Sequence, residues 1–373
     1  MKFALASGKK SPEPCPNAAI HGAPAWRRRG AGTGGEGGGH FFDPTGNEPD
    51  TPYVGQALKR IAFILNREPA LAPCFVAFLV RKPFHTFSKR FRLALNITPP
   101  GAPVTNFRAI FGQTRPVIGM VHLGALPGSP LHDPEAGLEG LIRAARHDLL
   151  ALQAAGFDAV MFGNENDRPY EFRVDTASTA TMAYVIGRLR HEITLPFGVN
   201  VLWDPMATLA LAAATGARFV REIFTGSYAS DMGPWTPDAG AAMRYRNRLG
   251  GRDVAMLYNV SAEFADSLDC RSLPDRARSA VFSSIPDAVL VSGQITGEAA
   301  RMQDLEAVKA VLPETPVLAN TGVKHDTVAE VLRIADGCIV GSALKVDGQT
   351  WNAIDPARAD DFMARARAAR RGR

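Results

Sequence analysis

The sequence predicts a (β/α)8 TIM barrel preceded by an N-terminal extension of low order, and three observations lead to this fold class. From residue 108 onward, eight short apolar runs alternate with helical patterns. These eight units occupy about 266 residues, which is close to the ~250 residues of a typical barrel. Residues 1–105 instead combine glycine-rich and proline-rich runs, a composition that cannot bury a large core.

The predicted strands follow one another at a steady spacing, each succeeded by a polar or glycine-rich loop and a helical stretch. The runs are residues 116–121, 158–162, 197–202, 218–223, 253–258, 287–292, 316–319 and 336–340. Two of the helical stretches end at Gly156 and Gly216, as a left-handed helix cap requires. An open doubly wound sheet is the alternative, but it would show fewer units and a GxGxxG turn after its first strand. Neither feature is found, so the barrel is favoured.

The N-terminal extension holds the positive charge of the chain. Residues 1–105 carry 14 Lys and Arg against 6 Asp and Glu, whereas the rest carries 28 against 31. The basic pI therefore gives the folded part no electrostatic reason to bind nucleic acid, and we expect no such partner. We predict that residues 1–105 are disordered or arise from a start codon placed too early, and that residues 106–373 form the barrel.

Cysteine usage and hydropathy indicate the compartment. The four cysteines show no CxxC spacing, so we expect neither a disulfide framework nor a zinc site, and a reducing, cytoplasmic location. The apolar stretch 61–80 is interrupted by charged residues and two prolines, which argues against a membrane-spanning helix. The alternative is a location at the periphery of a membrane.

Polar residues gather where the predicted strands end, and in a barrel these ends share one face. The candidate catalytic residues there are His122, Glu165, Asp167, Asp204 and Glu222. Converging carboxylates share protons, pair with bases or hold a hard cation such as Mg²⁺. The cation alternative would use Glu165, Asp167 and Asp204 as metal ligands. Against it, Asp204 precedes a proline and suits a helix N-cap, and Glu222 could pair with a neighbouring arginine, Arg221 or Arg218.

Glycine-rich turns end the last three predicted strands. In many barrels the turns after strands 7 and 8 cradle a phosphate with backbone N–H groups, and a side chain would hold the anion away. The predicted substrate and phosphate site is Asn200, Gly293, Thr296, Gly297, Asn320, Thr321, Gly322, Gly341 and Ser342. The alternative is that the glycines only turn the chain. Lys345 either neutralises a ligand or begins a solvated segment, and we favour the second interpretation.

Several of these stretches resemble the BtpA/SgcQ family of TIM barrels. The matching stretches are RPVIGMVHLGALPGSP, GFDAVMFGNENDRPY, GVNVLWDP, DAVLVSGQITG, VLANTGV and GCIVGSALK, in this order within residues 110–370. The resemblance implies a barrel of the ribulose-phosphate-binding type, in agreement with the predicted phosphate site, and no established reaction. It also implies that members in photosynthetic cells act as extrinsic factors that stabilise photosystem I. The long extension departs from the family pattern.

Two hypotheses for function follow. In the first, the barrel binds a phosphorylated, sugar-like small molecule, and His122, Glu165, Asp167 and Asp204 face its reactive part. Isomerisation, aldol-type cleavage and hydrolysis stay open, although the absence of lysine from every predicted strand argues against a Schiff-base aldolase. In the second, the barrel is a non-catalytic factor for the biogenesis of a membrane-associated protein complex. Homo-oligomers are common among such barrels, an expectation that rests on fold analogy alone.

Overall fold

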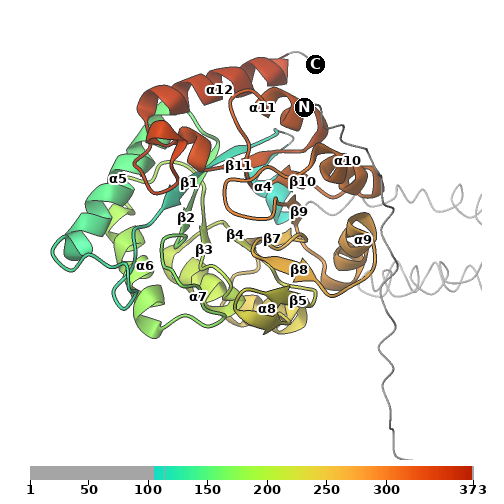
Figure 1. The fold of residues 1–373 in the computed structure, drawn as a ribbon, viewed down its shortest axis with the longest axis horizontal. Helices are drawn as coiled ribbons and strands as arrows, with labels where there is room; N and C mark the ends of the chain where they lie inside the picture. The colour runs from blue at the N-terminus through green and yellow to red at the C-terminus, as the bar shows by residue number, and fades with distance from the viewer. Residues whose placement is uncertain (1–104, 113, 372–373) are drawn as a thin grey trace, which may run out of the picture. The chain divides into compact units, whose positions relative to one another are not determined.

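The computed structural model describes residues 105–112 and 114–371 and contains a closed barrel of eight parallel strands (Figure 1). The barrel strands are β1 (Val117–His122), β2 (Ala159–Gly163), β3 (Phe197–Asn200), β4 (Phe219–Glu222), β7 (Ala255–Asn259), β9 (Ala288–Val291), β10 (Val317–Ala319) and β11 (Cys338–Val340). Around the barrel they follow the order β1-β11-β10-β9-β7-β4-β3-β2. The predicted fold class is confirmed, and each strand overlaps its predicted run. The predictions for the extension and for stretch 61–80 fall on residues outside the described ranges.

An outer ring of helices covers the strands (Figure 1). The helices that follow barrel strands or their loops are α5 (Gly137–Ala155), α6 (Thr176–Leu189), α7 (Pro205–Thr215), α8 (Ala239–Arg248), α9 (Leu273–Ser284), α10 (Met302–Val311), α11 (Val328–Ile334) and α12 (Pro356–Arg371). The caps of α5 and α7, Gly156 and Gly216, have φ values of 78° and 76°, as the sequence predicts. Across residues 105–112 and 114–371, no helix has both the length and the apolar character to span a bilayer.

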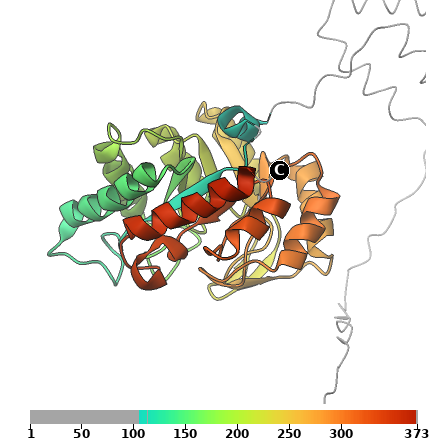
Figure 2. The ribbon, with the colours of Figure 1, turned by 90° about the horizontal axis from the view of Figure 1, so that it is seen from above.

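A short helix before the first strand closes the amino-terminal end of the barrel. Helix α4 (Asn106–Phe111) is capped by the side chain of Thr105, and it buries Phe107 and Phe111 in the cluster that fills the barrel interior. Figure 2 shows α4 at one end of the barrel, opposite the loops that follow β11. Ligand access is therefore left to the carboxyl end of the strands.

A small antiparallel sheet, absent from the sequence prediction, lies in the loops after β4 and β7. Its strands are β5 (Tyr228–Ser230), β6 (Gly233–Trp235) and β8 (Ala265–Ser267), in the order β6-β5-β8. Strands of three residues are too short for a period of two to stand out, and β8 pairs with β5 across a long stretch of sequence. An aromatic cluster that includes Trp203, Tyr228 and Trp235 packs beside this sheet.

Residues of the barrel strands alternate between the interior and the helix layer. In β1, Ile118 and Met120 belong to the interior cluster, whereas Val117 and Val121 pack toward the helices. The next interior position of each strand, at its carboxyl end, holds a polar residue or a glycine. This top layer consists of His122, Gly163, Asn200, Arg221, Asn259, Ser292, Asn320 and Gly341. The alternation thus delivers one residue from every strand to the carboxyl face.

Candidate functional site

A cavity of about 850 Å³ opens at the carboxyl face of the barrel. Its floor includes the top-layer residues His122, Arg221 and Asn320, and its walls come from the loops after β9, β10 and β11. The predicted phosphate-site residues that line it are Thr296, Gly297, Asn320, Thr321, Gly322, Gly341 and Ser342. Asn200 lines a smaller chamber beside the cavity, and Gly293 lines neither space. The structure therefore brings most of the predicted phosphate residues together.

The side chain of Arg221 is the centre of the floor. Its Nη2 donates to Glu165 Oε1 at 2.8 Å and to Asn200 Oδ1 at 2.6 Å, and its Nη1 donates to Asn320 Oδ1 at 3.4 Å. Arg221 is 7% exposed and Glu165 is 3% exposed, so this ion pair is buried. From the sequence, Arg221 was expected only as a possible partner for Glu222. Its interior position could have been found from the alternation, because it lies two residues after the inward-facing Phe219.

His122 and Glu165 face each other beside Arg221. Their closest atoms, His122 Nε2 and Glu165 Oε1, are 3.8 Å apart. Within the described part of the chain, the buried atoms His122 Nδ1 and Glu165 Oε2 have no hydrogen-bond partner. Burial lowers the pKa of His122, against the opposing effect of the Glu165 carboxylate. A neutral imidazole beside a carboxylate, both with an unused polar atom, is an arrangement that can accept and return a proton.

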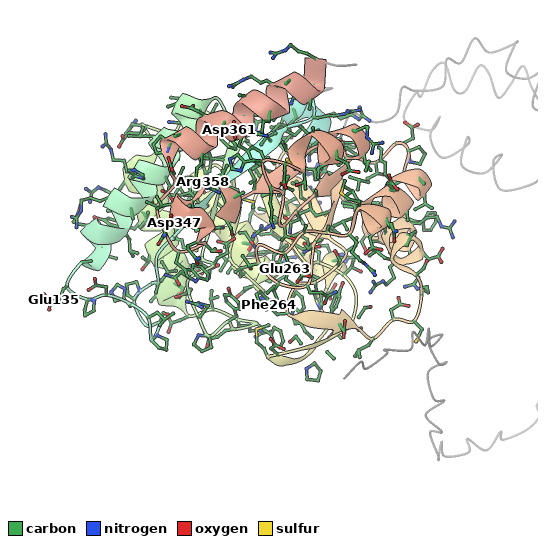
Figure 3. All side chains as sticks on the ribbon, turned by 45° about the horizontal axis from the view of Figure 1, so that its top comes forward. Glu135, Glu263, Phe264, Asp347, Arg358 and Asp361 are labelled. Atoms are coloured by element: carbon green, nitrogen blue, oxygen red, sulfur yellow. The ribbon has the colours of Figure 1, made fainter. Side chains whose placement is uncertain are left out.

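Glu263, on the loop after β7, is a cavity residue that the sequence analysis missed. Its Oε2 accepts a hydrogen bond from Thr296 Oγ1 at 3.0 Å, and its Oε1 accepts one from Asn320 Nδ2 at 3.4 Å. Burial raises the pKa of Glu263, against the opposing effect of the Arg221 guanidinium. Figure 3 shows Glu263 near the middle of the barrel mouth. Its only sequence signal is an acidic residue shortly after a barrel strand, the same signal that selected Glu165.

Asp167 and Asp204 hold loops in place and do not line the large cavity. Asp167 accepts hydrogen bonds from Leu126 N at 3.1 Å and from Ser178 Oγ at 3.3 Å. Asp204 caps α7 by accepting from the backbone N–H groups of its first turn, and its other oxygen accepts from Val174 N at 3.1 Å. The structure does not bring the three predicted metal ligands together. In residues 105–112 and 114–371, no group of three or more His, Cys, Asp or Glu side chains is arranged to hold a metal ion.

Glu222 also turns away from the large cavity, and it organises the backbone after β3. Its Oε1 accepts from Asn200 Nδ2 at 2.9 Å and from Trp203 N at 2.8 Å, and its Oε2 accepts from Ile223 N at 2.6 Å. Burial raises the pKa of Glu222 to about 8, although these hydrogen bonds oppose the rise. The carboxyl group therefore fixes the position of Trp203.

Two loop segments on the wall of the cavity contain backbone N–H groups that have no partner among the described residues. They belong to Gly322 and Val323 after β10 and to Ser342 and Ala343 after β11, and no hydrogen bond donated by them exists among the residues that the structure describes. Arg358 of α12 reaches this wall, where its Nε donates to the carbonyl oxygen of Ala343 at 3.0 Å. The remaining charged residues on the walls are Glu298, Lys324, Asp326 and Arg365.

The comparisons with known proteins agree with the predicted resemblance. Residues 113–368 match the model of the BtpA family. The chain belongs to this family. One relative, the putative sgc region protein SgcQ of Escherichia coli K12, is 46% identical over 264 residues, which cover 71% of this chain and 98% of the relative. The photosystem I biogenesis protein BtpA of Synechocystis is 34% identical over 256 residues, which cover 68% of this chain and 88% of that protein.

Among solved structures, the phosphoribosyl anthranilate isomerase of Thermus thermophilus aligns with 68% of this BtpA-family chain and 100% of its own. The sequence identity is 14% and the TM-score is 0.42. The assignment of the barrel rests on the strand order described above and takes nothing from this alignment.

Two of the predicted phosphate-site glycines, Gly322 and Gly341, have a packing role in this BtpA-family barrel. A Cβ atom added to Gly322 would lie 2.1 Å from the backbone N of Ala299, because the loop after β9 packs against this position. A Cβ added to Gly341 would lie 2.6 Å from Cε1 of His122. These glycines thus make room for neighbouring protein atoms, and Gly341 allows His122 to lie against the loop after β11.

The burial of Lys345 corrects the interpretation of this residue from the sequence. The favoured alternative, a solvated segment, is wrong, because Lys345 is 1% exposed and forms a buried ion pair with Asp148 of α5. The second oxygen of Asp148 accepts from Ile354 N at 2.8 Å. Lys345 does not line the large cavity. The pair therefore anchors both ends of the segment between β11 and α12 to helix α5.

Proposed function

We propose that this BtpA-family protein binds a phosphorylated, sugar-like small molecule in the large cavity and performs acid–base chemistry on it. The proposal is carried by the residues Gly322, Val323, Ser342 and Ala343, which line one wall and whose backbone N–H groups have no partner among the described residues. Backbone N–H groups in turns favour phosphate oxygens, since they supply several donors without a long side chain that must be ordered. Arg358 beside Ala343 adds a positive charge at the same wall.

The floor of the cavity supports the chemical half of the proposal. With the phosphate on the wall, the sugar part lies toward His122, Glu165 and Arg221. Neutral His122 accepts a proton from a carbon or hydroxyl group of the ligand, and the Arg221 guanidinium stabilises the negative charge that develops on a neighbouring oxygen. Glu263, whose pKa burial raises, returns a proton. These roles suit an isomerase or a lyase that forms an enolate-like intermediate.

Thermal unfolding of the full chain tests binding. Ribose 5-phosphate, ribulose 5-phosphate and inorganic phosphate are the probes, and a probe at ~100 times its Kd adds roughly 2.7 kcal/mol and raises Tm by a few degrees. Ser342→Asp places a carboxylate on the proposed phosphate wall, so it abolishes the rise. The matched control is Ser283→Asp on the exposed surface of α9, which keeps the rise.

Proton exchange tests the chemistry. In D₂O, an enolising enzyme incorporates deuterium into the bound sugar phosphate, which proton NMR detects. His122→Gln slows this exchange roughly 10²- to 10⁴-fold while the ligand still raises Tm. Exchange at the wild-type rate in that variant contradicts the proposed role of His122. If none of the three probes raises Tm, the proposed function fails, and the non-catalytic role in a membrane-associated complex becomes the better hypothesis.

A further inference from the structure

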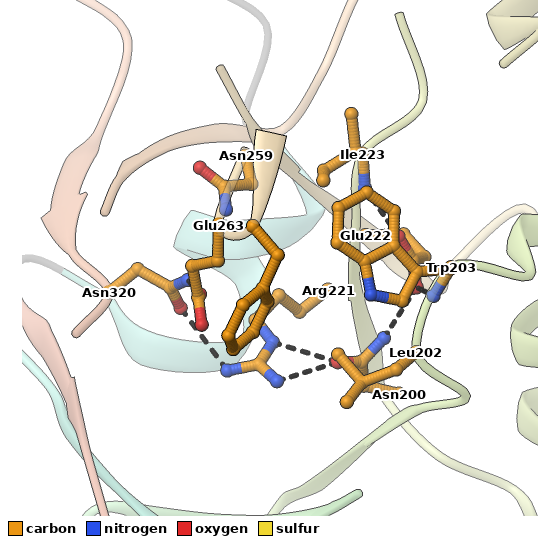
Figure 4. Close-up of a pocket in the computed structure, with 10 residues that line it drawn as sticks. Asn200, Leu202, Trp203, Arg221, Glu222, Ile223, Asn259, Glu263 and Asn320 are labelled. Atoms are coloured by element: carbon orange, nitrogen blue, oxygen red, sulfur yellow. Dashed lines mark hydrogen bonds between the residues drawn. The ribbon is translucent and has the colours of Figure 1, made fainter. Parts of the chain in front are cut away.

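A small inner chamber adjoins the large cavity (Figure 4). Its volume is about 30 Å³, and it shares Leu202, Arg221, Glu263 and Asn320 with the walls of the large cavity. The residues that line the inner chamber but not the large cavity are Asn200, Trp203, Glu222, Ile223, Asn259 and Phe264. The chamber is thus lined by both polar and apolar residues, and its polar residues include the Arg221 network.

One wall of the inner chamber presents a hydrogen-bond donor without an acceptor. Trp203 is 2% exposed, and its indole Nε1 is buried with no partner among the described residues. Figure 4 shows the indole of Trp203 together with Arg221 and Asn200, which line the same chamber. Buried donors in native proteins nearly always find an acceptor, so an unsatisfied one facing a chamber indicates that a molecule outside the chain supplies it.

Two aromatic residues of this chamber have unfavourable backbone conformations. Trp203 and Phe264 have φ values of 68° and 52°, a region that bulky residues rarely adopt. Glu222 holds Trp203 through the backbone N–H at 2.8 Å, and the ring of Trp235 packs against the indole with centroids 4.8 Å apart. Strain of this kind persists where surrounding contacts impose it, and it concentrates at ligand sites. The indole is therefore held in place before a ligand arrives.

The volume of the chamber and its indole N–H donor determine which ligand atoms it can accept. A volume of about 30 Å³ admits one or two atoms of oxygen size and excludes a sugar ring or a phosphate. The indole N–H requires an acceptor, and the small volume leaves room for a single oxygen of a ligand beside it. We propose that the inner chamber is a subsite for one uncharged oxygen of the ligand, a hydroxyl or a carbonyl, which accepts a hydrogen bond from Trp203 Nε1.

This inference rests on the proposed function and narrows its substrate class. The residues that carry the unpartnered N–H groups line the large cavity and not the inner chamber, so the phosphate and the oxygen belong to different parts of the ligand. The substrate class is then a sugar phosphate or polyol phosphate with a free hydroxyl or carbonyl oxygen outside the phosphate ester.

The test follows the indole N–H resonance of Trp203 in the ¹⁵N-labelled full chain, assigned by its loss in Trp203→Phe. Ribose 5-phosphate is expected to shift this resonance, and inorganic phosphate is not. The Trp203→Phe variant is expected to bind ribose 5-phosphate about 5- to 10-fold more weakly, the effect of one hydrogen bond, with phosphate binding unchanged. Trp351→Phe, at an exposed tryptophan that lines neither the chamber nor the large cavity, keeps wild-type affinity for both probes.

The outcomes separate this inference from the proposed function. If ribose 5-phosphate raises Tm but leaves the Trp203 resonance unmoved, the subsite is wrong and the proposed function stands. If neither phosphorylated probe binds, the proposed function fails, and unphosphorylated ribitol at high concentration then probes the chamber alone. A Trp203 resonance that ribitol also leaves unmoved overturns the subsite. Where Trp203→Phe does not fold, the Trp203 resonance of the wild-type protein is assigned by elimination, from the resonances lost in Trp26→Phe, Trp235→Phe and Trp351→Phe.

Discussion

Removing the guanidinium of Arg221 is expected to destabilise the barrel far more than removing an arginine from an exposed ion pair of the same length. Arg221→Met deletes the donors to Glu165, Asn200 and Asn320. The Glu165 carboxylate is then left buried with His122 at 3.8 Å as its nearest basic group. Breaking a buried ion pair by removing one partner costs about 3–5 kcal/mol. For a barrel of this size the loss lowers Tm by roughly 6–20 °C.

The matched control is Arg188→Met. Arg188 pairs with Glu139 at an N–O distance of 2.8 Å, the same as in the Arg221–Glu165 pair, but both partners are exposed. Water and salt screen such a pair, so its loss changes the free energy of unfolding little. Urea unfolding of the full chain at pH 7, followed by circular dichroism, measures both variants.

A double variant separates the buried charge from the lost packing. Adding Glu165→Gln to Arg221→Met removes the unpaired carboxylate, and it is expected to recover at least about 1 kcal/mol relative to Arg221→Met alone. Equal losses in Arg221→Met and Arg188→Met would refute the buried network as a source of stability. A double variant no more stable than Arg221→Met would show that packing, and not charge, explains the cost.

Three further predictions concern the supports of the site. Lys345→Met is expected to cost about 3–5 kcal/mol in urea unfolding, and adding Asp148→Asn to recover part of it; no recovery would contradict the ion pair. Gly322→Ala is expected to lower the free energy of unfolding by at least about 1–3 kcal/mol. Gly187→Ala, in a helix with open space around it, is expected to leave it unchanged or to raise it by up to ~1 kcal/mol. A destabilisation of the same size in both variants would contradict the packing role of Gly322. Because the pKa of Glu222 is raised to about 8, its contribution to stability is lost as pH rises from 4.5 through 8. Glu222→Gln is expected to flatten this pH dependence of the free energy of unfolding. An unchanged slope would show that another group causes the pH dependence.

The barrel itself could be predicted from the sequence because its signals are local. The alternation of apolar runs with helical patterns and the glycine caps Gly156 and Gly216 depend on neighbouring residues only. The same alternation brings His122 and Arg221 to the interior at the carboxyl end of their strands. Position along a strand thus predicts the face on which a side chain lies. Strands β5, β6 and β8 escaped prediction because each has only three residues, and because β8 pairs with β5 from a loop far along the chain.

The sequence by itself determined the family, the eight strands and the face that carries the polar residues. Only the tertiary structure decided which of those residues face the cavity. His122 and Glu165 face the cavity, whereas the carboxylate oxygens of Asp167 and Asp204 accept hydrogen bonds from donors in other segments. The physical reason is that a carboxylate turns toward whichever donors lie within hydrogen-bonding distance, and those donors come from segments far away in the chain. Burial of Lys345 follows the same rule, since its partner lies in a helix 197 residues earlier.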